Sequence, residues 1–192
     1  SEKALGNGIS LELIFKQLKD IRKKVNIPLI LMGYLNPIME YGIENFCKKI
    51  AEIGIDGTII PDLPLDIYQK EYRKIFEQYN LSNILLITPQ TSSDRLITID
   101  EATDSFIYMV SSAATTGTKG LDTNVLSRFS DKITKANLKS PKIIGFGISD
   151  KSSFENACKY ANGAIIGTAF IKAISESGDL LKNIRGFVKS IK

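Results

Sequence analysis

Histidine is absent from this chain of 192 residues, and cysteine occurs only twice. The absence of histidine removes the commonest general acid and base, every nucleophile that a histidine activates, and the commonest metal ligand. Any catalysis must therefore use carboxylates, tyrosine, lysine or backbone dipoles. We expect no metal and no cofactor.

The chain also lacks a cysteine pattern typical of disulfides, long apolar runs and basic clusters, and each of these absences excludes a class of structure or partner. Cys47 and Cys158 sit in helical patterns among apolar neighbours, which favours small buried hydrophobes in a reducing cytosol over a disulfide. No apolar run approaches the ~20 residues of a membrane span, and charged residues follow Ser1 directly, unlike a secretory signal. We expect a cytoplasmic protein with no membrane partner. The net charge of +4 comes from scattered lysines, so nucleic acid is not expected either.

Short apolar runs alternate with helical patterns along the whole chain, without a linker or a change in composition. Such alternation, with strands that are apolar throughout, is typical of a parallel sheet covered by helices on its faces. We predict a single α/β domain over residues 1–192. The expected strands lie at residues 28–33, 57–60, 84–87, 106–110, 142–146 and 163–167. The expected helices are a helix tail at 1–8, then 10–24, 43–53, 65–79, a short helix capped by Ser92 or Ser93, a helix from Asp122 or Asn124 to about 135, 150–160 and a last helical region to 191.

Two apolar runs, at 142–149 and 163–170, each contain one of these strands, which ends in glycine and is followed by the start of a helix. Glycine lets a phosphate oxygen approach the backbone N–H groups, and the N–H groups of a helix N-terminus complete the cradle. A single glycine after a strand is usually only a turn. Two such units in succession are typical of the phosphate site after the last two strands of a (β/α)8 barrel, whereas an open sheet usually has one glycine-rich turn after its first strand.

The number of strands does not fill such a barrel. A barrel needs eight strands, and this chain supplies six and opens on a helix. We therefore predict an incomplete (β/α)8 TIM barrel with strands 3–8 present and about two βα units absent from the N-terminal side. The strands at 29–33 and 163–167 would then be open edges, from which we expect poor solubility or self-association.

Five motifs make a family resemblance specific. They occupy residues 32–37, 60–64, 108–117, 145–149 and 164–169, and they occur in order and at matching spacing along the whole chain. Together they resemble the α subunit of tryptophan synthase. The resemblance implies a (β/α)8 barrel that cleaves indole-3-glycerol phosphate to indole and glyceraldehyde 3-phosphate. It also implies a β subunit as partner in an α2β2 assembly, at a surface near Asn36, Pro37, Asp62 and Pro64.

The resemblance also assigns roles to residues of this chain. Tyr34 and Tyr108 match the active-site tyrosines, and Thr116 matches the threonine of the loop that covers the site. With the strand-end residues Ile59, Leu86 and Phe146 these form the expected substrate-binding set. The expected phosphate-binding set is Gly117, Gly147, Gly167 and Thr168.

Two departures from the family limit what this chain can do. Ala114 stands where the family usually has a glycine, which stiffens the loop after the fourth predicted strand. The catalytic glutamate and aspartate of the family would precede Ser1, so we predict that no catalytic residue lies in this chain and that the chain alone is inactive. Two alternatives stay open: a non-catalytic phosphate-binding or interaction module, and another phosphate-binding barrel such as an isomerase of the same pathway.

Overall fold

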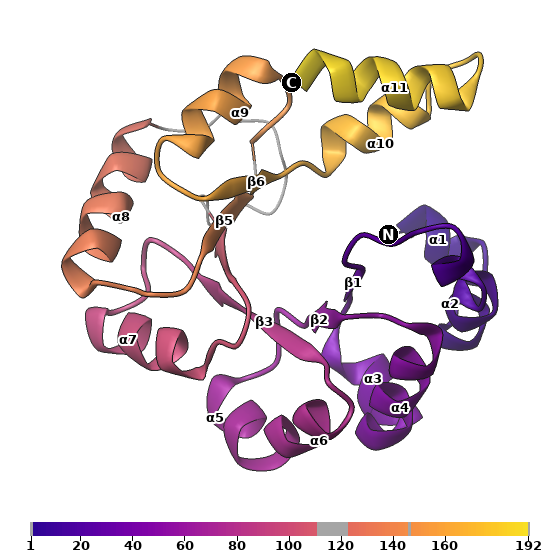
Figure 1. The fold of residues 1–192 in the computed structure, drawn as a ribbon, viewed down its shortest axis with the longest axis horizontal. Helices are drawn as coiled ribbons and strands as arrows, with labels where there is room; N and C mark the ends of the chain where they lie inside the picture. Colours follow the sequence, from indigo (N-terminus) through magenta and orange to yellow (C-terminus); the bar gives the residue numbers. More distant parts are fainter. Residues whose placement is uncertain (1, 111–122, 146, 192) are drawn as a thin grey trace. The chain divides into compact units, whose positions relative to one another are not determined.

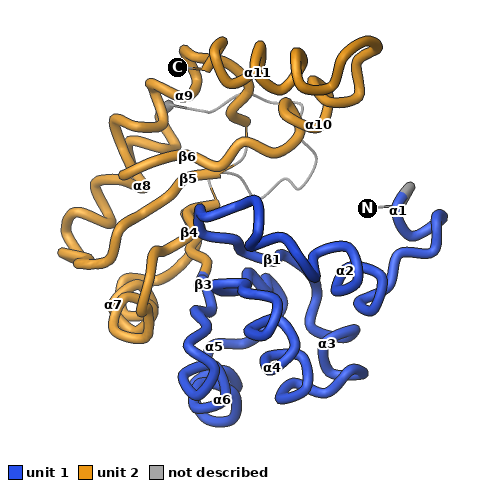
Figure 2. Tube along the Cα trace, turned by 45° about the vertical axis from the view of Figure 1, so that its right-hand side comes forward, with its two compact units in different colours: residues 1–85 blue, residues 86–192 orange. Residues whose placement is uncertain are grey.

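The computed structural model describes residues 2–110, 123–145 and 147–191. By its internal contacts the chain divides into two compact units, residues 1–85 and residues 86–192 (Figure 2). Each unit consists of parallel strands alternating with helices, so the predicted parallel α/β fold with six strands is confirmed (Figure 1). The prediction of one domain over the whole chain stays a prediction.

The first unit builds a parallel sheet in which β1, β2 and β3 follow one another in chain order. The register pairs Leu31 with Thr58 and Thr58 with Asn83. Its elements are α1 (Glu2–Gly6), α2 (Leu11–Leu18), the 3-10 turn η1 (Ile21–Lys23), β1 (Ile30–Met32), α3 (Leu35–Tyr41), α4 (Ile43–Ile53), β2 (Gly57–Ile59), α5 (Leu65–Ile67), the π-helical turn η2 (Tyr68–Tyr72), α6 (Arg73–Gln78) and β3 (Ser82–Ile87).

Local signals in the sequence explain where several of these elements begin and end. The hydroxyl of Ser10 accepts a hydrogen bond from Leu13 N and starts α2. Gly54 ends α4 with φ +89°, a left-handed conformation that glycine adopts without strain. The buried face of α4 carries Phe46 and Ile50, which lie in the core of this unit. Within the sheet, the hydroxyl of buried Thr58 hydrogen-bonds the side chain of Asn83 at 3.2 Å.

Arg22 of η1 connects the segment that precedes β1 with the segment that precedes β2. The guanidinium of Arg22 donates to the carbonyls of Gly54, Val25 and Ile27, and it pairs with the carboxylate of Asp56. The same carboxylate accepts a hydrogen bond from Leu29 N at 2.7 Å. This set of contacts, the Arg22 network, fixes the entries to β1 and β2 at the amino ends of the strands.

The second unit repeats the pattern with β4, β5 and β6, again parallel and in chain order. Tyr108 pairs with Ile143, Val110 with Gly145, and Gly145 with Ile165. Its elements are α7 (Ser93–Ala102), β4 (Ile107–Val110), α8 (Thr123–Ala136), β5 (Lys142–Gly145), α9 (Lys151–Cys158), β6 (Gly163–Ile165), α10 (Thr168–Ile174) and α11 (Leu180–Ile191).

Polar side chains hold the turns of this unit. Ser92 caps α7 by accepting from Arg95 N. Near the end of α7, the carboxylate of Asp100 accepts hydrogen bonds from Lys139 N and Ser140 N in the turn after α8. Burial raises the pKa of Asp100, but these two backbone donors, together with the Ser140 side chain and the charge of Lys142, outweigh it and hold the pKa below its usual value.

Three details differ from the sequence-based expectation. The first predicted helix, expected to reach Lys24, ends at Leu18 and is followed only by the short turn η1. Helix α3 is not among the predicted helices; Pro37 lies in its first turn, where proline costs no hydrogen bond. Cys158 is exposed, so its interpretation as a buried hydrophobe is wrong, whereas Cys47 is buried and burial raises its pKa to about 12. In the part of the chain that is described, no helix has the length and hydropathy to cross a membrane.

Open strand edges and exposed apolar side chains occur in both units. Among the described strands, β1 hydrogen-bonds only to β2, and β6 only to β5. Large apolar side chains are also exposed in both units: Leu5, Ile27, Met32 and Met39 in the first, and Ile171, Leu180, Leu181 and Val188 in the second. Strand edges without a partner, next to apolar side chains, promote pairing between chains.

We therefore expect the 192-residue chain to elute as oligomers in size-exclusion chromatography with light scattering. Replacing Ile27 or Leu181 by lysine should shift the population toward monomer, because a charge opposes packing of these faces. A wild-type chain that is monodisperse and monomeric over a wide concentration range would contradict this expectation.

Candidate functional site

The two predicted phosphate glycines leave the sheet at the same edge. The register pairs Gly145 of β5 with Ile165 of β6, and both strands run in the same direction. Gly147 comes two residues after Gly145, and Gly167 comes two residues after Ile165. Both glycines therefore lie just beyond the carboxyl ends of neighbouring strands. In parallel α/β folds this edge is the one that carries ligand sites.

The backbone at these two positions favours an anion, although in different ways. Gly147 has φ +76°, a conformation that L side chains rarely adopt. Gly167 is the N-cap of α10, and no side chain caps that helix. Among the described residues, no side chain accepts a hydrogen bond from the N–H groups of the first turn of α10, and Thr168, the first residue of the helix, is exposed.

The start of α9, in contrast, is already occupied by the protein itself. Asp150 and Ser153 form a capping box in which Ser153 N donates to the Asp150 carboxylate at 2.8 Å. These hydrogen bonds hold the pKa of Asp150 below its usual value. The capping box takes up Ser153 N at the start of α9. The expectation that a helix N-terminus completes the phosphate cradle after each of the two strands stays a prediction.

Tyr108 and Gly145 fit together on one face of the second sheet. The side chain of Tyr108 is 5% exposed, and this burial raises its pKa. A Cβ at Gly145 would lie 2.3 Å from the Tyr108 Oη atom and 2.4 Å from a ring carbon. The ring can occupy this position only because the neighbouring strand has no side chain there.

Several apolar side chains of β1, β2 and β3 point to one side of these strands; among them are two predicted substrate contacts, Ile59 in the first unit and Leu86 at the start of the second. Met32 is in register with Ile59, and Ile59 with Ile84, so their side chains point to the same side. Leu86 follows Ile84 by two residues in β3 and points the same way. Ile59 is buried, whereas Met32 is 60% exposed and Tyr34, the N-cap of α3, is 70% exposed.

The predicted partner surface is exposed and internally linked. Asn36, Pro37, Asp62 and Pro64 are all exposed. Both oxygens of the Asp62 carboxylate accept from Leu35 N, at 2.9 and 3.1 Å. Asp62 thereby caps α3 from the loop after β2, a role that sequence reasoning missed because the two residues are far apart in the chain.

Three predicted site residues, Thr116, Gly117 and Phe146, lie outside the described residues, as does Ala114. The predicted set is therefore divided: β5 and β6 bring Gly147, Gly167 and Thr168 to one edge, while Tyr34 and Ile59 belong to the first unit. The roles of all these residues stay predictions.

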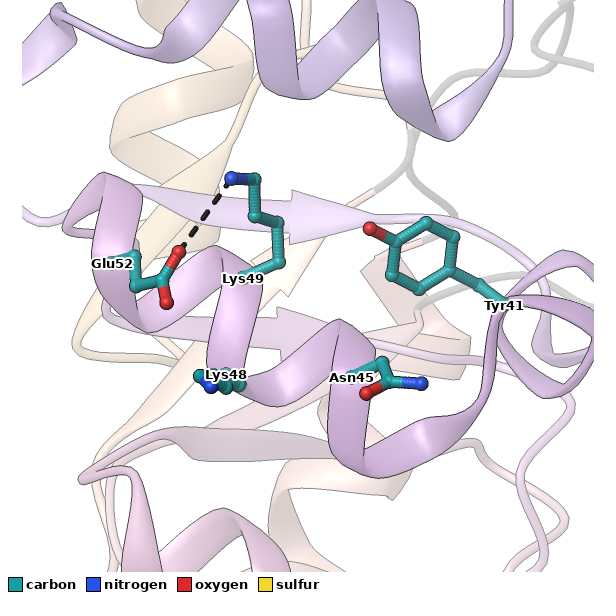
Figure 3. Close-up of a pocket in the computed structure, with 5 residues that line it drawn as sticks. All are labelled: Tyr41, Asn45, Lys48, Lys49 and Glu52. Atoms are coloured by element: carbon teal, nitrogen blue, oxygen red, sulfur yellow. Dashed lines mark ion pairs between the residues drawn. The ribbon is translucent and has the colours of Figure 1, made fainter.

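Two hollows open on the first unit, and neither contains a metal site. One, of about 220 Å³, has apolar walls from α1, α2 and β1 and includes Met32, Tyr34 and Pro37. The other, of about 210 Å³, lies on α3 and α4, where Lys49 reaches Glu52 at 3.5 Å beside Tyr41 and Asn45 (Figure 3). Within the described residues, no group of three histidine, cysteine or acidic side chains could hold a metal ion.

Comparison with known proteins is consistent across sequence and structure. The family model described as "Tryptophan synthase alpha chain" matches residues 1–189. The tryptophan synthase alpha chain of Flavobacterium johnsoniae is 55% identical over 192 residues, which are 100% of this chain and 75% of that protein.

Two solved structures extend the likeness to the fold. The tryptophan synthase alpha chain of Legionella pneumophila matches with a TM-score of 0.85 and 30% identity, covering 99% of this chain and 71% of that one. Mycobacterium tuberculosis tryptophan synthase matches with a TM-score of 0.85 and 25% identity, covering 99% and 70%. The fold is thus an α/β fold of the TIM-barrel type; the numbering of its strands as 3–8 stays a prediction.

Proposed function

Because the chain belongs to the tryptophan synthase alpha chain family, whose members are lyases of tryptophan biosynthesis, we propose that its ligand is indole-3-glycerol phosphate. In the reaction, a proton is added to the indole ring, and the bond from the ring to the hydroxyl-bearing glycerol carbon breaks. That hydroxyl loses its proton, and the products are indole and glyceraldehyde 3-phosphate. The enzyme must therefore hold a dianion, a flat ring and two proton-transfer groups.

The observation that carries the proposal is the pairing of β5 with β6, which sets Gly147 and Gly167 at one sheet edge. Backbone N–H groups at Gly147 and at the start of α10 would hold the phosphate, with the hydroxyl of Thr168 beside them. Because Asp150 takes the N-terminus of α9, its carboxylate limits how far the dianion can approach that helix. Gly117 would complete the set.

The ring end of the ligand calls for an apolar slot with few polar groups. Tyr34, Ile59, Leu86, Tyr108 and Phe146 would supply it. The burial of Tyr108 against Gly145 supports this role for Tyr108, because a ring fixed by its neighbours offers a preformed surface to a flat ligand.

We propose further that the two proton-transfer carboxylates lie outside these 192 residues, which span about three quarters of the length of the Flavobacterium johnsoniae relative. The chain by itself would then bind indole-3-glycerol phosphate without cleaving it. The exposed residues Asn36, Pro37, Asp62 and Pro64 would contact a β subunit in an α2β2 assembly.

The absence of tryptophan from the chain gives a direct test. In a mixture of protein and indole-3-glycerol phosphate, the ligand carries the only indole group, so its fluorescence anisotropy reports binding when excitation is chosen beyond the tyrosine band. We expect saturable binding, competition by glyceraldehyde 3-phosphate and by inorganic phosphate, and no release of indole.

Each other outcome is informative. No binding of indole-3-glycerol phosphate and no competition by phosphate would remove the proposed function. Release of indole by the purified chain would show that the proton-transfer groups are within it. Addition of coding sequence upstream of Ser1 separates a lyase from a non-catalytic phosphate-binding module, because only the lyase gains turnover.

A further inference from the structure

A tightly closed turn follows β3 at its carboxyl end. Thr91 N donates to the carbonyl of Thr88 at 3.0 Å, and Thr88 N donates to the hydroxyl of Thr91 at 2.9 Å. The turn begins directly after Ile87, the last residue of β3, and ends at Ser92, the N-cap of α7. Its conformation therefore sets how β3 ends and where α7 begins.

Lys132 holds this turn from another helix. It lies in the second half of α8, more than forty residues along the chain, and its side chain is half-buried. Its ammonium group donates to the carbonyl of Thr91 and, at 3.5 Å, to that of Pro89. Lysine side chains on a helix lean toward its N-terminus, which is the direction of this turn.

We propose that Lys132 is a positioning residue for the ring end of the ligand site, an inference that rests on the proposed function. Leu86, the predicted ring contact in β3, is separated from the turn by Ile87 alone and is half-buried. Loops at the carboxyl ends of the strands form the ligand sites of TIM-barrel folds. By fixing the turn, Lys132 fixes the end of β3 and with it the side of the slot that Leu86 contributes.

The contact is suited to this purpose because it is charged and reaches backbone rather than side chains. A hydrogen bond from an ammonium group is stronger than one between neutral groups. Removal of the ammonium leaves two part-buried carbonyls without this donor, a cost that the turn can lower only by moving. The effect should reach the ring slot and spare the phosphate cradle, which is built on β5, β6 and α10.

The test compares variants of one helix in the 192-residue chain. Lys132→Met removes the charge and keeps the stem, and Lys132→Arg restores a donor. Lys135→Met makes the same change on an exposed position of α8. The affinities for indole-3-glycerol phosphate and for glyceraldehyde 3-phosphate are measured by anisotropy and by competition, and hydrogen exchange of the Thr91 amide reports the turn itself.

We expect Lys132→Met to weaken binding of indole-3-glycerol phosphate by about tenfold and to speed exchange of the Thr91 amide, with unchanged affinity for glyceraldehyde 3-phosphate. Both affinities of Lys132→Arg should stay within about twofold of the wild-type values. Both affinities of Lys135→Met should equal those of the wild type. Equal loss of both affinities would indicate a general structural role and overturn the inference. If the wild-type chain binds both ligands and Lys132→Met has the same two affinities, this inference alone is overturned. If the wild-type chain binds neither ligand, the proposed function is overturned as well.

Discussion

Replacement of Gly145 by alanine is expected to lower the free energy of unfolding by about 1 to 3 kcal/mol, the range for an extra methyl group in a packed interior, and to abolish binding of indole-3-glycerol phosphate. The added Cβ would lie 2.3 Å from Tyr108 Oη and 2.4 Å from a ring carbon. The ring is almost fully buried, so it can yield only by leaving its place in the sheet face. Displacement of the ring removes a predicted contact of the ligand.

A nearby glycine supplies the matched control. Gly163 of β6 is in register with Ile143, as is Tyr108, and a Cβ there would meet no atom within 4 Å. The Gly163→Ala variant should therefore fold and bind like wild type. If Gly163→Ala and Gly145→Ala lose the same stability, the cause is the backbone of these strands and not the ring of Tyr108.

A change at Tyr108 should relieve the clash with the added Cβ of Gly145→Ala only if it removes the ring itself. Tyr108→Phe removes the oxygen but leaves the ring carbon at 2.4 Å, so it should not rescue Gly145→Ala. Tyr108→Leu removes both atoms, and the double variant should be more stable than the two single losses predict, by about 1 kcal/mol or more. Urea unfolding of the four proteins gives this coupling; simple additivity would show that the two residues do not interact.

Replacement of Arg22 by methionine is expected to lower the free energy of unfolding by about 2 kcal/mol, because several charge-assisted hydrogen bonds disappear together. The Arg22 network connects the end of α2 and η1 to Gly54 after α4 and to Asp56 before β2. Its carbonyl acceptors and the carboxylate of Asp56 would have to be solvated instead. The stem of Arg22 also packs on Gly54, where a Cβ would lie 2.6 Å from the Arg22 Cγ atom.

Two further variants test the geometry. Arg22→Lys keeps the charge but lacks the planar fork, so it should recover less than half of the loss. Lys23→Met removes the neighbouring charge, which pairs with Asp20 on the surface, and should leave the urea midpoint unchanged. The idea fails if Arg22→Met and Lys23→Met unfold at the same urea concentration.

Much of the fold could be predicted from the sequence, because its signals are local. Apolar runs locate all six strands, and Ser10, Gly54 and Ser92 mark helix ends through contacts with residues three or four positions away. The predicted phosphate-binding residues Gly147 and Gly167 are likewise visible in the sequence, because each lies two residues after the end of an apolar strand.

The contacts that could not be predicted join residues that are distant in the chain. Nothing in the sequence connects Lys132 with the turn at Thr88–Thr91, or Asp62 with Leu35. The capping of α9 by Asp150 is a local contact, and Asp150 and Ser153 have the spacing of a capping box; the same helix start also follows a glycine-ended strand, a pattern that equally indicates a bound anion. Local patterns indicate where a ligand can bind, whereas long-range contacts decide which of the candidate groups are still available.

The hydrogen bonds from Leu35 N to the Asp62 carboxylate connect the loop after β1 with the loop after β2. The segment that carries Tyr34 can move away from the sheet only if the hydrogen bond from Leu35 N to the Asp62 carboxylate breaks. The loop that contains Asp62 and Pro64 would then lose this contact with α3. A protein that docked on the loop after β2 would therefore also restrict the loop after the neighbouring strand β1, and with it the position of Tyr34.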